Sequence, residues 1–155
     1  MNPLHKSALI ISILVGLWVY LSIGNPHLNL NPWVGFVAWA TFFAAGGNNN
    51  AARSSAVVGV TSILLTAITL YVVGLAGGSL FSMLVLVPIL SFILVAMSQH
   101  VSLSYTPGAF LGAACYFGAG TNFDITILYV VISWLTGLSL GLASVRLDTL
   151  TTAKN

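Results

Sequence analysis

The stretch "NPWVGFVAWATFFAAGGNNN", residues 31–50, decides how this chain is organised, because a later stretch resembles it. It has the composition of a short aromatic helix, with Asn-Pro at its start and Gly-Gly-Asn at its end. Proline suits the first turn of a helix, and glycine suits the position that follows the last turn. The later stretch, "TPGAFLGAACYFGAGTN", covers residues 106–122, and its Pro107 lies 75 residues after Pro32. We therefore expect two related short helices in one chain.

The composition places this chain in a membrane. Of its 155 residues, 58% are hydrophobic and 4% are charged, and the mean hydropathy is +1.04. A soluble domain carries roughly 25% charged residues, which it needs to cover a surface in contact with water. The four Lys and Arg residues are too few for a nucleic-acid binding patch. We predict a single transmembrane domain over residues 1–155, with the lipid bilayer as its partner.

Clusters of Gly, Pro, Asn and Ser divide the chain into six apolar segments, at roughly residues 7–23, 32–47, 54–75, 80–98, 107–120 and 125–146. Four of them have 17 to 22 residues, which is enough to span a bilayer. The second and fifth have 16 and 14 residues and reach about 21–24 Å, against a hydrocarbon core of about 30 Å. They are either full spans extended by polar flanks or half-helices. The first run resembles a signal sequence, but no small-x-small cleavage site follows it, so we expect a retained helix.

Charge placement favours an all-α membrane protein with six transmembrane helices. If all six segments cross, the four basic residues share one side of the membrane: Lys6, Arg53, Arg146 and Lys154. The opposite side then has no Lys or Arg. Under the positive-inside rule, both termini are cytoplasmic. If the second segment turned back instead, Arg53 would move to the other side.

The repeated stretch extends to two halves of the chain. At the same spacing the fourth segment lies over the first and the sixth over the third, which gives halves of approximately 7–75 and 80–148. Each half then has three spans, so the second half enters the membrane from the opposite side. Such inverted repeats are common in transporters, whose substrate site lies where the halves meet. The competing interpretation is chance, because Pro, Gly and Phe are frequent in membrane helices.

Small and hydroxyl side chains recur at helical spacing. Glycines four residues apart in the fifth and sixth segments allow helix backbones to approach closely. The third segment carries a stripe of small polar residues that includes Ser62 and Thr66, and such a face suits a narrow polar path. The alternative is that these hydroxyls bond to carbonyls of their own helix.

Candidate solute contacts lie at the ends of the short helices and at one aromatic position. Asn31, Asn48 and Thr106 fall at helix ends, where they face a passing solute; the alternative for Asn31 and Thr106 is that they cap free backbone N–H groups. Phe43 and Tyr116 lie near the ends of the two stretches and are candidates for a repeat-related narrow point that selects by size. The alternative for these aromatics is packing against lipid or the core.

Ionisable residues are absent from the middle of every predicted span. Ion-coupled transporters usually keep such residues in the membrane, so coupling through Asp124 or Arg53 at the segment edges is a secondary alternative. No spacing of His, Cys and carboxylates is typical of a metal site, and neither a Ser–His pair nor a phosphate-binding loop indicates catalysis. We therefore expect no enzyme activity, no metal and no cofactor.

The run "WATFFAAGG", residues 39–47, together with the later "TPGAFLGAACYFGAG", resembles a family of small bacterial inner-membrane proteins, the domain-of-unknown-function 1097 family. The resemblance extends over nearly the whole chain. It implies a location in the bacterial inner membrane, and it brings no catalytic or binding residues with it.

Together these observations favour a passive channel or facilitator for a small neutral polar solute, such as urea, a short amide or a polyol. The path would use hydroxyls and backbone carbonyls without charges. Gly-rich faces on several helices predict a homo-oligomer. The alternatives are a structural or regulatory membrane subunit that does not transport, and an ion-coupled transporter of small solutes.

Overall fold

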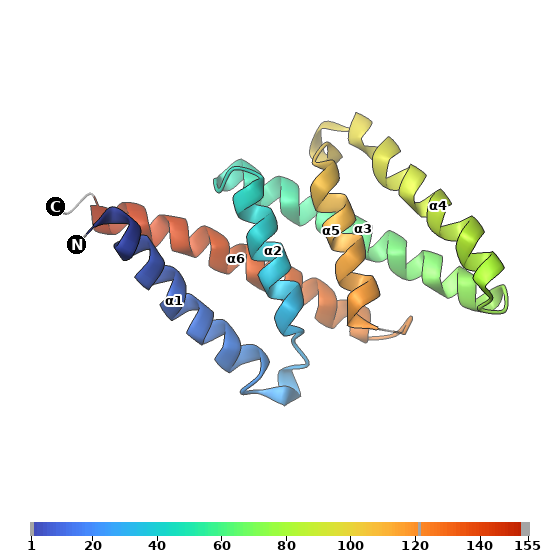
Figure 1. Cartoon of the computed structure of the whole chain (residues 1–155), viewed down its shortest axis with the longest axis horizontal. Coiled ribbons are helices and arrows are strands. Elements are labelled where there is room, and N and C mark those ends of the chain that lie inside the picture. Colours follow the sequence, from blue (N-terminus) through green and yellow to red (C-terminus); the bar gives the residue numbers. More distant parts are fainter. Residues whose placement is uncertain (1, 121, 153–155) are drawn as a thin grey trace.

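The structure, a computed structural model, describes residues 2–120 and 122–152 of the chain. Within those residues it contains α-helices and short 3-10 helices and no strand, which confirms the predicted all-α class (Figure 1).

The same order of elements occurs twice along the chain. The first half contains α1 (Pro3–Ser22), the 3-10 helix η1 (Pro26–Leu28), α2 (Pro32–Ala44) and α3 (Asn49–Leu75). The second half contains α4 (Leu80–Ala96), the 3-10 helices η2 (Met97–Gln99) and η3 (Val101–Leu103), α5 (Thr106–Ala119) and α6 (Thr126–Thr152). The short helices α2 and α5 have 13 and 14 residues, and α3 and α6 have 27 residues each.

Among the described residues, four helices are long and apolar enough to cross a membrane: α1, α3, α4 and α6. The chain is therefore a membrane protein, and α2 is a shorter apolar helix, as the sequence indicates. The predicted third and sixth segments were too short, because α3 begins earlier, at Asn49, and α6 continues to Thr152. Hydropathy marks the apolar part of a helix, whereas backbone hydrogen bonds and caps extend it into polar residues. At the start of α3 the Asn48 side chain accepts a hydrogen bond of 2.9 Å from the Ala51 N–H.

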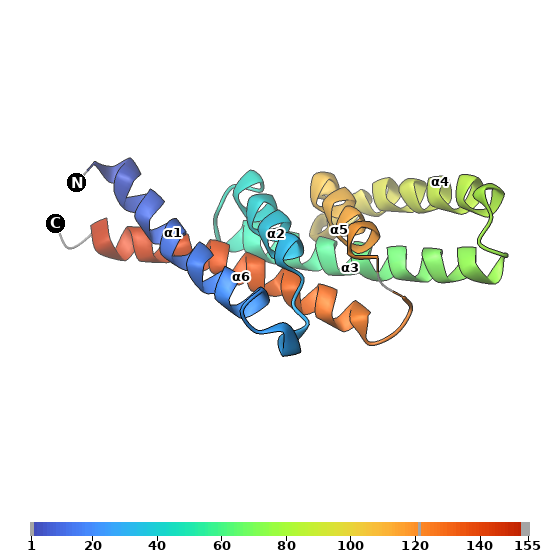
Figure 2. The ribbon, with the colours of Figure 1, turned by 60° about the horizontal axis from the view of Figure 1, so that its bottom comes forward.

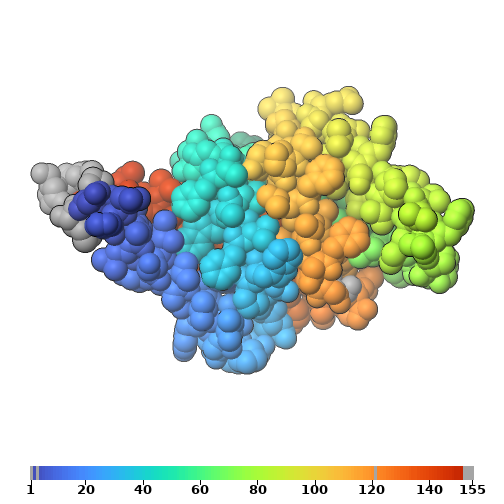
Figure 3. Space-filling view, in the orientation of Figure 1, coloured from blue at the N-terminus to red at the C-terminus, as the bar shows by residue number. Residues whose placement is uncertain are grey.

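The helices form two layers. Figure 1 shows α3 and α6 as long helices that run past each other near the centre of the molecule, with α2 in front of α6 and α5 in front of α3. The view in Figure 2 places α1 over α6 and α4 over α3, in the same layer as the short helices. The main helix pairs are α2 on α6 and α5 on α3. The space-filling view in Figure 3 shows that α2 and α5 cover the middle of this face.

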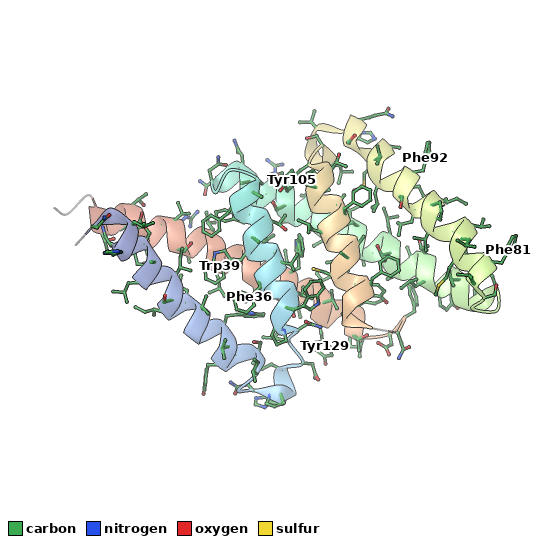
Figure 4. The ribbon with its side chains drawn as sticks, viewed as in Figure 1. Phe36, Trp39, Phe81, Phe92, Tyr105 and Tyr129 are labelled. Carbon is green, nitrogen blue, oxygen red and sulfur yellow. The ribbon has the colours of Figure 1, made fainter. Side chains whose placement is uncertain are left out.

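The core lies where α2, α3, α5 and α6 meet. Its largest fully buried side chains include Trp134, Phe42, Tyr116 and Ile63. By contrast, α4 turns many large apolar side chains outward, and Phe81 and Phe92 are 76% and 74% exposed and project from the bundle in Figure 4. In a membrane protein such a face is solvated by lipid.

Candidate functional site

The crossing of α2 and α6 is a contact between two backbones. A Cβ atom added at Gly137 would overlap the carbonyl oxygen of Gly35 and lie 2.8 Å from its carbonyl carbon. Any larger residue at position 137 would push the two helices apart. The glycine spacing on the sixth segment therefore serves close helix packing, as small residues do in membrane bundles.

The crossing of α5 and α3 uses a glycine in the same way but faces a side chain. A Cβ atom at Gly112 would overlap the Ser62 hydroxyl and lie 2.8 Å from the carbonyl oxygen of Gly59. Ser62 is fully buried, and its hydroxyl donates a 2.9 Å hydrogen bond to that same Gly59 carbonyl. The second crossing is thus a glycine packed against a hydroxyl as well as a backbone.

Indole rings cover the glycines Gly35 and Gly59 from another side. The Trp18 ring lies over Gly35, and its Nε1 donates a 2.9 Å hydrogen bond to the Pro32 carbonyl. The Trp134 ring lies over Gly59, and its Nε1 donates a 3.1 Å hydrogen bond to the Ser55 carbonyl. Sequence reasoning missed both tryptophans, because a lone Trp in an apolar run carries no signal of the helix it will meet.

The hydroxyl stripe of α3 is sealed inside the bundle in this structure. Ser62 and Thr66 have no exposed surface. Thr66 donates a 2.7 Å hydrogen bond to the Ser62 carbonyl, and Thr69 donates one of 2.8 Å to the Leu65 carbonyl. These hydroxyls therefore satisfy carbonyls of their own helix, which is the alternative given above. Ser62 and Thr66 as solute contacts stay a prediction.

Phe43 and Tyr116 lie in two separate hollows and do not meet at one narrow point. The Tyr116 hollow has a volume of about 270 Å³ and is lined by Ala67, Leu70, Tyr71, Gly74, Leu75, Tyr116, Asn122 and Phe123. The Phe43 hollow has a volume of about 170 Å³ and is lined by Ser7, Ile11, Phe43, Ser144, Val145, Asp148 and Thr149. Because α2 and α5 run in opposite directions, their C-terminal ends lie at opposite edges of the molecule (Figure 1).

The two aromatic side chains also differ in burial. Phe43 is 43% exposed, whereas Tyr116 is 1% exposed and its hydroxyl donates a 3.2 Å hydrogen bond to the Asn122 carbonyl. In the Phe43 hollow the Ser144 hydroxyl donates a 2.6 Å hydrogen bond to the Gly141 carbonyl. Each hollow thus combines an aromatic side chain with polar groups at the end of a long helix.

The polar residues at the helix ends have different roles. Asn48 caps the start of α3, a role that the sequence did not predict, whereas the predicted side-chain capping by Asn31 and Thr106 was wrong, since neither short helix has a side-chain cap bond. Both short helices carry Pro in their first turn, which removes one N–H group that would need a partner. The Asn31 backbone N–H instead donates a 2.8 Å hydrogen bond to the hydroxyl of Ser133 on α6. Thr106 is the first residue of α5, with Tyr105 before it.

Two residues outside the sequence prediction connect the short helices to their surroundings. The Tyr105 hydroxyl donates a 3.4 Å hydrogen bond to the Thr41 carbonyl and so links α5 to α2. Trp39 projects from α2 toward α1 in Figure 4, and its buried Nε1 has no hydrogen-bond partner among the described residues. The residue type alone does not reveal whether a Tyr or Trp side chain finds a hydrogen-bond partner, because that depends on which helix packs against it.

Charged side chains lie near the ends of the helices. Asp124 accepts hydrogen bonds from the N–H (2.8 Å) and the hydroxyl (2.7 Å) of Thr126, and these bonds lower the pKa of its carboxyl group. Arg146 donates a 3.2 Å hydrogen bond to Asn49, and Lys6 donates one of 3.5 Å to the Asp148 carbonyl. Among the described residues, no three His, Cys, Asp or Glu side chains are grouped as metal ligands.

Comparison with known proteins agrees with this architecture. The chain is 31% identical to the "Uncharacterized protein YahC" of Escherichia coli K12, over 93% of this chain and 90% of that protein. It is 25% identical to the "Inner membrane protein YcdZ" of the same organism, over 90% of this chain and 85% of that protein. No solved structure matches the chain significantly. A family model described as "Protein of unknown function (DUF1097)" matches residues 8–148, so the chain belongs to the DUF1097 family.

Proposed function

We propose that the chain crosses the bacterial inner membrane six times, as two inverted three-helix halves with both termini in the cytoplasm. The repeated order of elements and the matched pairs α2 on α6 and α5 on α3 support this topology. The contacts of Lys6 with Asp148 and of Arg146 with Asn49 bring the start of α1, the end of α6 and the start of α3 together. Those ends carry basic residues, as the cytoplasmic side of a membrane protein does.

On this topology we infer passive facilitated permeation of a small neutral polar solute of the urea, short-amide or polyol type. The observation that carries this inference is the pair of hollows at opposite ends of the molecule, one beside Phe43 and one beside Tyr116. Inverted repeats in transporters place related parts of a path on the two sides of the membrane. The chain has no Asp, Glu, Lys, Arg or His between positions 54 and 99, and this favours a neutral solute.

Permeation requires the two hollows to connect. In this structure the two hollows share no lining residue, and the helices pack closely at Gly137 and Gly112. A conducting state therefore needs the short helices to move relative to α3 and α6, which would expose the hydroxyls of Ser62 and Thr66. Because these hydroxyls donate to carbonyls of their own helix, such a movement would not break their hydrogen bonds.

A second candidate function is a structural or regulatory subunit that does not transport. The observation that favours it is the complete burial of Ser62 and Thr66 behind glycine crossings, which leaves the bundle closed. In that case the apolar outer faces of α1 and α4 would pack against copies of this chain or against another membrane protein.

Stopped-flow light scattering on proteoliposomes separates the two candidates. Urea, acetamide, glycerol and water are compared with protein-free vesicles, and we expect faster equilibration of one solute class. Phe43→Trp should slow that solute several-fold by narrowing its hollow. The matched control is Phe36→Trp on the same helix, because Phe36 is 41% exposed and lines neither hollow, and it should leave the rate unchanged.

Equal rates with and without folded protein, for all four solutes, would contradict permeation and favour the subunit. The ion-coupled alternative has its own readout, because uptake would then depend on a proton gradient and fall with Asp124→Asn. We expect no dependence on the gradient, because the Asp124 carboxylate is engaged in hydrogen bonds to Thr126 at the start of α6.

A further inference from the structure

A hollow of about 210 Å³ lies where the start of α3 meets the loop before α5. It is lined by four residues of α3 and two of η3: Asn50, Arg53, Ser54, Val57, Val101 and Ser102. In the topology proposed above, this hollow opens at the cytoplasmic surface of the membrane. It is distinct from the Phe43 and Tyr116 hollows and shares no residue with them.

Arg53 gives this hollow a positive charge that no carboxylate of the described chain neutralises. Its side chain is exposed and forms no hydrogen bond or ion pair with the described residues. The acidic residues of the chain are Asp124 and Asp148, and neither lines this hollow. Arg146, by contrast, donates to Asn49. A guanidinium group at a membrane surface with no protein partner is suited to bind an anion with planar, two-bond geometry.

Polar and apolar side chains line the hollow together with Arg53. The Asn50 amide and the Ser102 hydroxyl line the hollow and form no hydrogen bond with the described residues, so both are available as donors. Val101 is 91% exposed and Val57 is 38% exposed at the same place. A water-facing surface would not favour an exposed valine beside a free cation, whereas a phosphate with acyl chains below it contacts both.

The related hollow on the opposite side of the molecule has no such charge. It is lined by Asn29, Asn31, Thr126, Tyr129 and Val130, with a volume of about 170 Å³. Arg53 is the fifth residue of α3, and the fifth residue of α6 is Val130, which is buried. The cation is therefore present in one of two equivalent places. Anionic lipid headgroups are concentrated in the cytoplasmic leaflet, which is where the proposed topology puts Arg53.

From this geometry we propose that the Arg53 hollow binds the phosphate of an anionic phospholipid. The guanidinium of Arg53 contacts the phosphate oxygens, Asn50 and Ser102 donate further hydrogen bonds, and Val57 and Val101 contact the start of the acyl chains. The inference uses the orientation proposed above and does not depend on transport. It can therefore hold if the solute assays fail, and it can fail if they succeed.

Native mass spectrometry of the purified full-length chain, titrated with phosphatidylglycerol or phosphatidylcholine, tests this site. We expect phosphatidylglycerol to bind at least about five-fold more tightly than phosphatidylcholine, as one contact between an arginine and a phosphate at the membrane surface allows. Arg53→Ala should remove most of that preference, and Arg53→Lys should keep part of it because lysine retains the charge without the planar fork. The matched control is Arg146→Ala, which removes a basic residue near the same surface and should leave the preference intact.

Two further arms separate a lipid from a free anion. Val101→Ser should weaken phosphatidylglycerol binding while leaving the charge in place, because Val101 would contact acyl chains and is too exposed to support the fold. Inorganic phosphate at millimolar concentration should not displace the lipid. Displacement by phosphate, equal binding of the two lipids, or an unchanged preference in folded Arg53→Ala would each overturn the proposal.

Discussion

The two helix crossings do the same structural task with different contacts. Where α6 meets α2, Gly137 faces the backbone of Gly35, which cannot move without moving the helix. Where α5 meets α3, Gly112 faces the Ser62 hydroxyl as well as the backbone of Gly59. The Ser62 side chain can rotate away or be shortened by substitution, whereas the Gly35 backbone can do neither without moving its helix. The comparison teaches that the glycines of the two helix crossings differ in how well they tolerate substitution, although they look alike in the sequence.

The largest effect is expected for Gly137→Ala. The new methyl group would overlap the Gly35 carbonyl, so the helices must separate and lose contact along the crossing. We expect a loss of about 3 kcal/mol in the free energy of unfolding, at the upper end of overpacking effects. Unfolding in mixed micelles, followed by tryptophan fluorescence, measures it. The control is Gly16→Ala in α1, where nothing lies within 4 Å of the added atom and stability should not fall.

A smaller effect is expected for Gly112→Ala, with a loss of about 2 kcal/mol. Here the Ser62 hydroxyl is one of the obstructing groups, so Ser62→Ala should recover about 1 kcal/mol of that loss in the double variant. The same unfolding assay closes this double-mutant cycle. Strict additivity of the two substitutions would contradict the role given to the hydroxyl and leave the Gly59 backbone as the whole obstacle.

The tryptophans on either side of the crossings give the third prediction. Trp134→Phe removes the hydrogen bond to the Ser55 carbonyl, whereas Trp39→Phe removes an indole N–H that has no partner among the described residues. Both substitutions delete a similar buried area. We therefore expect Trp134→Phe to cost about 1 kcal/mol more than Trp39→Phe, which is the net contribution of one buried hydrogen bond. Equal losses in the unfolding assay would show that packing alone decides both sites.

The smallest effect concerns the starts of the two long helices. Asp124 binds the Thr126 N–H at the start of α6, and Asn48 binds the Ala51 N–H at the start of α3. The folded pKa of Asp124 lies below its ordinary value of 3.8, so its stabilisation is complete above that pH and is lost as the pH falls through the lowered pKa. Asn48 does not titrate. We measure hydrogen exchange of the backbone amides and correct it for its intrinsic pH dependence. The Thr126 amide should lose protection in acid, and the Ala51 amide should keep its protection.

An equal loss of protection at Ala51 would show that acid loosens the whole bundle and does not act through Asp124. Asp124→Asn provides a second check, because the amide keeps an acceptor oxygen but no longer titrates. This variant should retain the protection of Thr126 at low pH to the same degree as at neutral pH.

Much of the architecture follows from the order of residues. The low charge content requires a membrane, and the apolar runs correctly indicate the long helices α1, α3, α4 and α6. The two short helices follow from the Pro-containing starts and glycine ends of the repeated stretch. The roles of individual polar residues follow less well. Asn31 and Thr106 have the right residue types for caps, yet neither side chain makes a cap bond: Asn31 stands at the N-cap position without one, and Thr106 is already the first residue of α5, with Tyr105 at the N-cap position.

The sequence by itself determined that this protein lies in a membrane, that its described residues form helices, and where the long and short helices fall, because each depends on local composition and on the spacing of turn residues. The tertiary structure alone decided which glycine meets a backbone and which meets a hydroxyl, that Ser62 and Thr66 are covered, and that Phe43 and Tyr116 lie in separate hollows. Those outcomes depend on how far one helix slides and turns against its neighbour. That position is set by the sum of many weak contacts across the interface, and no single segment carries it.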